Sequence, residues 1–167
     1  MDGSHRRAGA LLKTVGAALA VAGPVMVWRG RGGRTEIRTE LAAQKITFPD
    51  HGLPAELAAH TGRRVETGPE AHAYAEFIKG NLAHVTGGRT YAEISAELHA
   101  AGGDDDKLAE LRQTAFMGQS LRASLMSAYQ AWQLTTLVTG LGAALTGLGV
   151  ALAATADALA PRSPNRS

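Results

Sequence analysis

The stretch TGLGAALTGLGVAL, residues 139–152, repeats seven residues with a single change, Ala143 to Val150. The repeat sets four glycines and two threonines into the longest apolar segment of the chain. Residues seven apart stay near one face of a helix, because a heptad is close to two helical turns. Glycine on such a face lets a second helix approach closely in lipid. The repeat therefore predicts a membrane-spanning helix that packs against a neighbour.

The segment from Leu134 to Ala156 has no charged residue, and Asp157 is the first charge after it. Its 23 residues correspond to roughly 34 Å of helix, which crosses a hydrocarbon core of about 30 Å with some tilt. A soluble helix of this length normally has a polar stripe, and this segment offers only threonines and glycines. Tyr129 and Trp132 stand directly before it as interfacial anchors. We predict a transmembrane helix over 134–156.

A second apolar segment, Ala8 to Trp28, lies near the amino end. As a helix it rises roughly 31 Å, which is also long enough to span. Lys13 lies close to its start, where the aliphatic stem reaches the interface. Membrane helices tolerate a proline such as Pro24. We predict a transmembrane helix over 8–28, with Trp28 as its interfacial anchor.

A cleaved signal peptide is the alternative for the same segment. His5, Arg6, Arg7 and Lys13 would supply its basic start, and Ala20-Val21-Ala22 would form an A-x-A cleavage site. The apolar segment, however, continues beyond this site to Trp28. An uncleaved anchor is therefore the favoured interpretation.

Both apolar segments contain small residues four positions apart, which let helix backbones approach closely in lipid. These pairs are Gly140–Ala144, Gly142–Thr146, Ala143–Gly147, Gly16–Ala20 and Ala18–Ala22. The predicted helix-packing residues are Gly16, Ala20, Gly140, Gly142, Ala144, Thr146, Gly147 and Gly149. Their partner is the other span, a second copy of the chain or another membrane protein, although a composition rich in alanine and glycine also produces such pairs by chance. We expect the hydroxyl groups of Thr139 and Thr146 to bond back to the carbonyl group one turn earlier.

Charge sets the predicted orientation. The amino end holds three basic residues and one acidic residue, the segment 29–133 holds twelve and thirteen, and the carboxyl-terminal tail holds two and one. Basic ends favour the cytoplasm. We predict a cytoplasmic amino end (1–7), an extracytoplasmic segment (29–133) and a cytoplasmic tail (157–167) in a multi-pass protein of the cell membrane. The arginine cluster at 29–38 opposes this orientation, although long loops translocate largely regardless of charge.

Turn signals divide the segment between the spans into helices. The predicted helices cover 35–45 as a continuation of the first span, 55–60, 68–85 and 90–100. Pro49 imposes an extended conformation on the residue before it, and Thr90-Tyr91-Ala92-Glu93 is a capping box. Because no proline occurs from Asp105 until Pro161, one long helix is expected to run into the second span. The predicted fold is an all-α membrane protein in which two transmembrane helices flank a mainly helical segment.

Three motifs between the spans support a resemblance: KITFPD at 45–50, HVTGGRTYAE at 84–93 and RQTAFMGQSLRASLMS at 112–127. Over almost its whole length the chain resembles an actinobacterial family of small two-pass membrane proteins. The resemblance implies two membrane spans around a helical segment. Members of that family often carry the name aromatic ring-opening dioxygenase, which would imply a membrane enzyme, but the motifs themselves have no known activity.

The dioxygenase name can be compared with the residues that such chemistry needs. A non-haem iron site takes two histidines and a carboxylate that converge on the metal. Glu56 and His60, and likewise His72 and Glu76, are spaced to share a helix face. Neither pair has a second histidine at helical spacing. Solvated surface residues are the favoured interpretation, so we predict no metal and no cofactor.

Composition argues against several other classes of protein. The chain has no cysteine, so disulfides and thiolate chemistry are excluded. A net charge of +2 is too small to indicate a nucleic-acid partner. The expected partners are the lipid bilayer and either a second copy or another membrane protein. The favoured function is a structural or interaction module of the cell envelope, and the alternative is a membrane enzyme.

Overall fold

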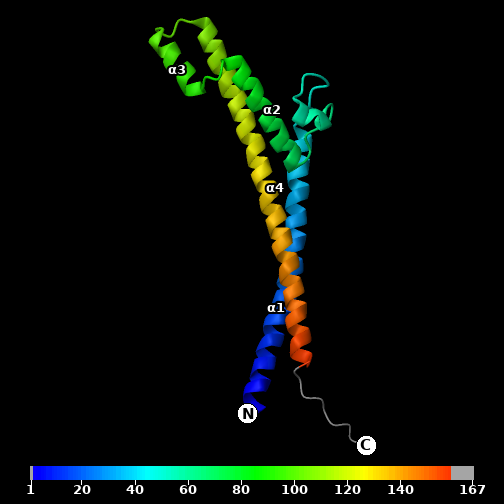
Figure 1. Cartoon of the computed structure of the whole chain (residues 1–167). Coiled ribbons are helices and arrows are strands. Elements are labelled where there is room, and N and C mark those ends of the chain that lie inside the picture. The colour runs from blue at the N-terminus through cyan, green and yellow to red at the C-terminus, as the bar shows by residue number, and fades with distance from the viewer. Residues whose placement is uncertain (1, 159–167) are drawn as a thin grey trace, which may run out of the picture. The chain divides into compact units, whose positions relative to one another are not determined.

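The computed structural model describes residues 2–158, with side chains from residue 7 onward. The described chain forms α1 (Asp2–Ala43), the 3-10 helix η1 (Ala55–His60), α2 (Gly68–Thr86), α3 (Tyr91–Ala100) and α4 (Asp106–Ala158) (Figure 1). Strands are absent from these residues, and an isolated bridge joins Thr47 to Arg64. The predicted all-α fold is confirmed, including the long last helix that contains the second apolar segment.

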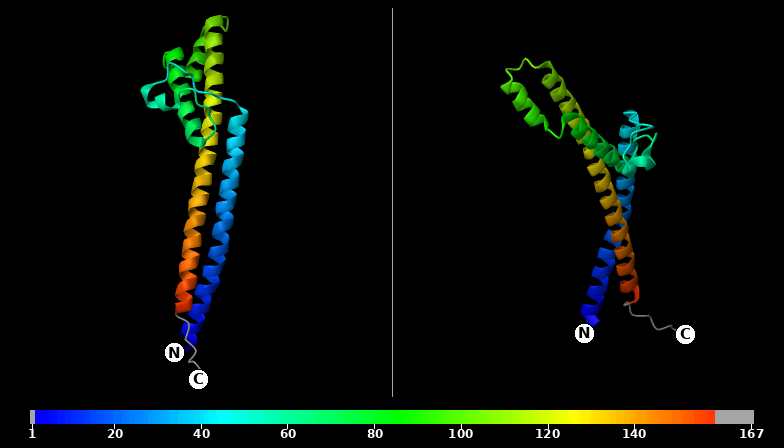
Figure 2. Two further views of the ribbon diagram at one scale, coloured as in Figure 1. Left: turned by 90° about the vertical axis from the view of Figure 1, so that its right-hand side faces the viewer. Right: turned by 45° about the horizontal axis from the view of Figure 1, so that its top comes forward.

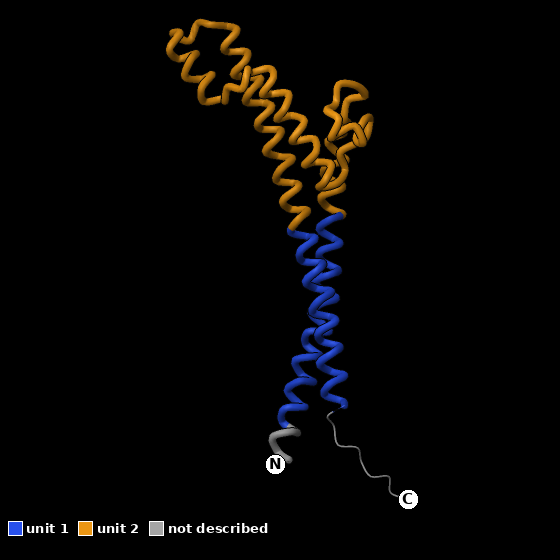
Figure 3. The backbone as a smooth tube through the Cα atoms, viewed as in Figure 1, with its two compact units in different colours: residues 1–34, 134–167 blue, residues 35–133 orange. Residues whose placement is uncertain are grey.

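The chain divides into two compact units (Figure 3). The first unit combines residues 1–34 with 134–167, and the second unit consists of residues 35–133. Helices α1 and α4 each contribute to both units, because neither helix is interrupted at the boundary. The predicted continuation of the first span as a helix is therefore confirmed, with Pro24 inside α1.

In the first unit, α1 and α4 run side by side in opposite directions (Figure 2). Both helices are long and apolar enough to span a membrane, and the most apolar window of each is only 11% buried. Large side chains such as Leu11, Val21 and Leu137 are about two-thirds exposed. Exposed apolar area is unfavourable in water by about 25 cal/mol per Å². A continuous surface of this kind is suited to lipid.

The second unit has a small hydrophobic core. Its buried members come from α1, the loop after it, α2 and α4, and they are Leu41, Phe48, Val65, Ala71, Ala73, Ala75, Ile78 and Leu125. The loop 44–67 closes on itself over this core through two backbone hydrogen bonds of 2.9 Å. The N–H of Phe48 donates to the carbonyl of Arg63, and the N–H of Val65 donates to the carbonyl of Ile46. Helix α2 and the loop before it thus pack on α1 and α4 around one core and do not stand as separate elements.

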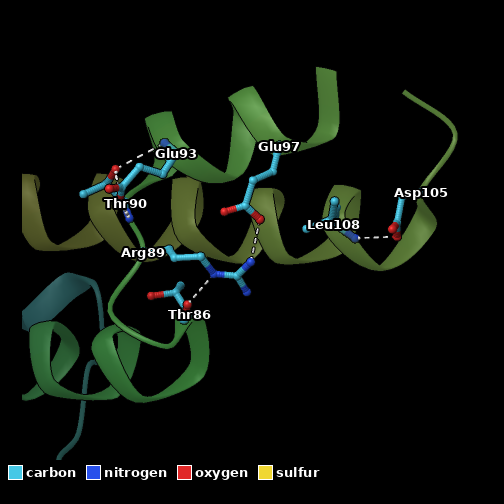
Figure 4. Close-up of polar contacts among 7 residues, drawn as sticks. All are labelled: Thr86, Arg89, Thr90, Glu93, Glu97, Asp105 and Leu108. Carbon is cyan, nitrogen blue, oxygen red and sulfur yellow. Dashed lines mark hydrogen bonds and ion pairs between the residues drawn. The ribbon is translucent and has the colours of Figure 1, made fainter. Parts of the chain in front are cut away.

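Side-chain caps fix where α2 and α3 begin. The Glu93 carboxylate accepts from the Thr90 N–H at 2.7 Å, and the Thr90 hydroxyl accepts from the Glu93 N–H at 3.2 Å (Figure 4). The capping box predicted at this position is confirmed. Thr67 and Glu70 form a second box at the start of α2. Gly87 ends α2 with a φ of 63°, a left-handed conformation that suits glycine.

Two further contacts secure the turns around α3. The Arg89 guanidinium donates to the Thr86 carbonyl at 2.9 Å and to the Glu97 carboxylate at 2.6 Å, which ties the end of α2 to α3 (Figure 4). The Asp105 carboxylate accepts from the Leu108 N–H at 3.0 Å. This cap confirms the predicted start of the long last helix.

Candidate helix-packing site

The first unit holds a line of close backbone contacts between α1 and α4. We call this line the glycine seam, and its members are Gly16, Gly23, Gly30, Gly142 and Gly149. A Cβ atom added to Gly149 would lie 2.5 Å from the Ala20 nitrogen and 2.6 Å from the Gly16 carbonyl oxygen. A Cβ atom added to Gly142 would lie 2.7 Å from the Gly23 carbonyl oxygen. These distances are well inside van der Waals contact, so glycine is required at both positions of α4.

The glycines of α1 lie equally close to atoms of α4. A Cβ atom on Gly16 would lie 2.8 Å from the Gly149 carbonyl oxygen. On Gly23 it would lie 2.5 Å from the Gly142 carbonyl oxygen, and on Gly30 it would overlap the hydroxyl of Thr139. The two backbones therefore touch where Gly16 meets Gly149 and where Gly23 meets Gly142, whereas at Gly30 the Thr139 side chain lies between the helices.

The heptad period of the glycine seam keeps its members on one face of each helix. Its members on α1 are seven residues apart, and so are its two members on α4. A repeat of 3.5 residues per turn keeps one face of each helix towards the other when the pair coils gently. In lipid such close approach is the main source of helix association, because the tails are as apolar as the side chains they would replace.

Threonine hydroxyl groups beside the seam are satisfied within their own helix. Thr139 donates to the Thr135 carbonyl at 2.7 Å, and Thr146 donates to the Gly142 carbonyl at 2.8 Å. The expected bonds to the preceding turn are confirmed. Because these hydroxyls have partners, threonine can line an apolar seam without leaving an unpaired polar group in lipid.

The structure brings five of the eight predicted packing residues together, and they are Gly16, Ala20, Gly142, Thr146 and Gly149. The other three are on the outer side of α4. A Cβ atom on Gly140 or Gly147 would meet no atom within 4 Å, and Ala144 is exposed. Residues two apart are about 200° apart around a helix. Gly140, Ala144 and Gly147 therefore do not face α1, and their packing on a second copy or on another membrane protein stays a prediction.

Two members of the seam, Gly23 and Gly30, are absent from the predicted set. Their signal is present in the sequence, because Gly16, Gly23 and Gly30 form a heptad series that matches the spacing of the quoted repeat. Extending the heptad series of the first apolar segment past Trp28 would have found both glycines.

At each end of the seam, a polar contact joins α1 to α4. At one end the Lys13 ammonium group lies 2.5 Å from the Asp157 carboxylate. At the other end the Arg34 guanidinium donates to the Thr136 hydroxyl at 2.7 Å. These contacts show the antiparallel register of the pair, since residues early in α1 meet residues late in α4.

The three aromatic residues predicted as interfacial anchors have different surroundings. Trp28 is 73% exposed on α1. Tyr129 lies against the His72 ring at 4.6 Å and accepts a hydrogen bond from Gln133 at 2.7 Å. Trp132 packs on Gly68, where an added Cβ would overlap the indole. Tyr129 and Trp132 thus pack within the second unit, and the anchoring role of all three stays a prediction.

The two acid–histidine pairs do not form a metal site. His60 stacks on the Phe48 ring at 5.0 Å, and His72 is part of an aromatic contact. Glu76 forms an ion pair with Lys79 at 3.2 Å. Among the side chains that the structure describes, residues 7–158, no group of three or more His, Asp or Glu is placed to hold a metal ion.

Glu70 is a buried carboxylate with several hydrogen-bond donors around it. It accepts from the N–H groups of Glu66 and Thr67 at 3.0 Å, from the Thr67 hydroxyl at 2.9 Å and from the Arg63 guanidinium at 2.9 Å. Burial alone would raise the pKa of Glu70, but these donors outweigh burial and lower the pKa. Glu70 is therefore charged at neutral pH, and it holds the start of α2 in place.

A cleft of about 460 Å³ opens in the second unit between α1 and α4. Its walls include Glu36, Ile37, Glu40 and Leu41 from α1 and Ser127, Ala128 and Ala131 from α4. Both carboxylates come from one helix, and no histidine, lysine or arginine is among the lining residues. Glu36 and Glu40 are four residues apart on α1, so they lie on the side of the helix that faces this cleft.

No protein-family model matches the chain, and neither a curated protein nor a solved structure matches it. The helix-packing site is therefore identified from the geometry of α1 and α4 alone.

Proposed function

We propose that this chain is a two-span integral protein of the cell membrane that serves as a structural or interaction module of the envelope. The observation behind the proposal is the contrast between the faces of α1 and α4 in the first unit. Their inner faces pack to backbone contact at Gly142 and Gly149. Their outer faces are apolar and exposed. A helix pair of this kind gains more from a lipid environment than from water.

The proposed arrangement keeps the boundaries drawn from the sequence. Residues 8–28 and 134–156 span the membrane, residues 29–133 lie outside the cytoplasm, and residues 1–7 and 157–167 lie inside it. The basic balance of both ends supports this orientation. The resemblance to a family of two-pass membrane proteins supports the number of spans.

The seam supports an uncleaved amino-terminal anchor. Cleavage after Ala22 would remove Gly16 and Ala20, which face Gly149, together with Lys13, the partner of Asp157. Gly149, one of the two members of the seam on α4, would then lose its neighbours on α1. We propose that the mature chain retains the whole of α1.

The orientation is tested by labelling single cysteines, since the chain has none of its own. Ala96 is exposed on α3, whereas the hydroxyl of the adjacent Ser95 is buried, so Ala96 is the better position. We expect A96C to react with a membrane-impermeant maleimide on intact cells. We expect S163C, in the tail outside the described residues, to react only after permeabilisation.

Orientation, membrane insertion and the uncleaved anchor are each tested by a separate measurement. Labelling of S163C but not of A96C on intact cells contradicts the orientation. Release of the protein from membranes by alkaline carbonate contradicts integral insertion. A mature chain that begins at Gly23, detected by mass spectrometry, contradicts the uncleaved anchor.

A further inference from the structure

The glycine seam fixes which residues of α1 and α4 lie at the same level along the helix pair. Gly16 lies against Gly149 near one end, and Gly30 lies against Thr139 near the other end. Because the helices are antiparallel and touch at both levels, a charge on one helix can be assigned to a level on the other. The charged residues of both helices therefore bound one shared apolar surface, which we call the apolar belt.

The ion pair of Lys13 and Asp157 forms the first edge of the apolar belt. The ammonium group lies 2.5 Å from the carboxylate, and both side chains are about 60% exposed. An exposed carboxylate is unfavourable in hydrocarbon. The side chain of Asp157 is short, so it cannot carry its charge far along the helix. This edge therefore lies where the hydrocarbon ends.

Arg29 of α1 forms the second edge. It is exposed and directly precedes Gly30, so it lies close to the level of Thr139. The residues of α4 before Thr139 lie beyond this level, although they are still apolar; Leu134 and Leu137 are 62% and 67% exposed. The charge-free segment of α4 is thus longer than the belt, and α1 sets the length of the belt.

The apolar belt is short for a typical bilayer. The helical rise is roughly 24 Å from Lys13 to Arg29 and roughly 27 Å from Thr139 to Asp157. A typical hydrocarbon core is about 30 Å thick. Outward extension of the Arg29 side chain offsets part of the difference. The remainder has to be met by local thinning of the bilayer, which costs free energy.

We propose that the helix pair is matched to a thin bilayer, so that it binds phospholipids with short acyl chains in preference to longer ones. The inference rests on the proposed insertion into a membrane. Between the two edges neither helix has a charged residue. The large side chains there are about half to two-thirds exposed, and they include Val15, Val21, Val25, Leu141 and Leu148. This surface meets the acyl chains, and its height selects their length.

Trp28 provides a reporter beside the second edge. It is 73% exposed and adjacent to Arg29. The chain has two tryptophans, so W132F leaves Trp28 as the only one. The full-length W132F protein is placed in vesicles of brominated dioleoyl phosphatidylcholine mixed with either dimyristoleoyl or dioleoyl phosphatidylcholine. The lipid that binds more strongly displaces more of the brominated lipid and reduces the quenching of Trp28. The headgroup is constant, so the comparison reports acyl-chain length alone.

We expect dimyristoleoyl phosphatidylcholine, which has the shorter chains, to be preferred over the dioleoyl lipid about twofold or more. In the same background, R29L moves the first charge after the belt to Arg31, roughly 3 Å further along the helix. R29L should therefore shift the preference towards the dioleoyl lipid. The matched control R29K retains a positive charge at the same level and should keep the preference for short chains. The unsubstituted chain, measured in parallel, should show the same order of preference as W132F.

Two outcomes overturn the inference while leaving membrane insertion intact. One is quenching of Trp28 with equal or stronger binding of the dioleoyl lipid in both the W132F and the unsubstituted protein. The other is the same preference in R29L as in R29K, which would mean that Arg29 does not set the edge of the belt. Absence of quenching by the brominated lipid contradicts insertion itself, and thus the proposed function.

Discussion

Gly149 of α4 lies so close to Ala20 of α1 that one methyl group on Gly149 would meet the Ala20 nitrogen at 2.5 Å. Gly147, two residues earlier on the same helix, would meet no atom within 4 Å. The quoted heptad repeat therefore contains two glycine pairs with different surroundings. One pair is enclosed between the helices, and the other faces outward.

Enlarging the enclosed pair should separate the two spans. We expect G142L and G149L each to weaken the packing of α1 on α4 by on the order of 1 to 2 kcal/mol, because the leucine forces the backbones apart and dispersion contacts are lost. The measurement is an association assay between segments 8–28 and 134–156 in a membrane. V150L, at an exposed neighbouring position, is the control. Equal association of G149L and V150L would show that the seam does not hold the pair together.

Enlarging the outward pair should leave the helix pair intact and act on contacts between copies. We expect G140L and G147L to weaken self-association of the segment 134–156 by on the order of 1 to 2 kcal/mol, and to do so more than V150L. Energy transfer between labelled copies in vesicles measures this. Unchanged transfer in both variants means that Gly140 and Gly147 reflect composition and not a contact face.

The ion pair at the end of the seam should contribute to its register. Lys13 and Asp157 are about 60% exposed, so solvent screens the pair and the expected coupling is about 0.2 to 1 kcal/mol. We expect K13E to weaken the packing of the two spans and K13E/D157K to restore part of it. A double-mutant cycle in the association assay, on segments extended to include both residues, gives the coupling energy. Additive effects of the two single substitutions would mean that the pair does not interact.

Glu70 should make the second unit less stable in acid. Its pKa is lowered in the folded protein, so its stabilisation is complete above the ordinary value of 4.5 and is lost as the pH falls through the lowered folded value. We expect E70Q to reduce the free energy of unfolding by about 1 to 3 kcal/mol at neutral pH and to flatten its acid dependence. Unfolding in denaturant at neutral and acidic pH measures both.

Glu93 is the matched control for Glu70, because both carboxylates close a capping box with a threonine three residues earlier. Glu93 is exposed, whereas Glu70 is 8% exposed. E93Q should therefore have the smaller effect. A larger effect of E93Q would contradict the role assigned to burial at Glu70.

Local signals predicted where the helices begin and end. The capping box at Thr90 and the prolines and glycines between elements act within a few residues, so their consequences can be read from the sequence. The same rule applied to Thr67-Gly68-Pro69-Glu70 would have predicted the second capping box. The absence of proline between Asp105 and Pro161 likewise indicated the long α4.

The face that each helix presents to the other was not predictable from the second span alone. Gly140 and Gly142 look equally suited to packing in the repeat, and the choice depends on the antiparallel register with α1. That register is set by contacts between residues more than a hundred positions apart, such as Arg34 with Thr136. The packing of Trp132 on Gly68 is a tertiary contact of the same kind.

The closeness of the glycine seam has a consequence for transport. Where the Gly16 and Gly149 backbones touch, the space between the two spans is smaller than a water molecule, and the line of contact continues past Gly23 and Gly142. An ion or a polar solute needs a continuous hydrated route across the hydrocarbon. In the proposed membrane-spanning pair, the line of contact between α1 and α4 therefore leaves no room for a hydrated route.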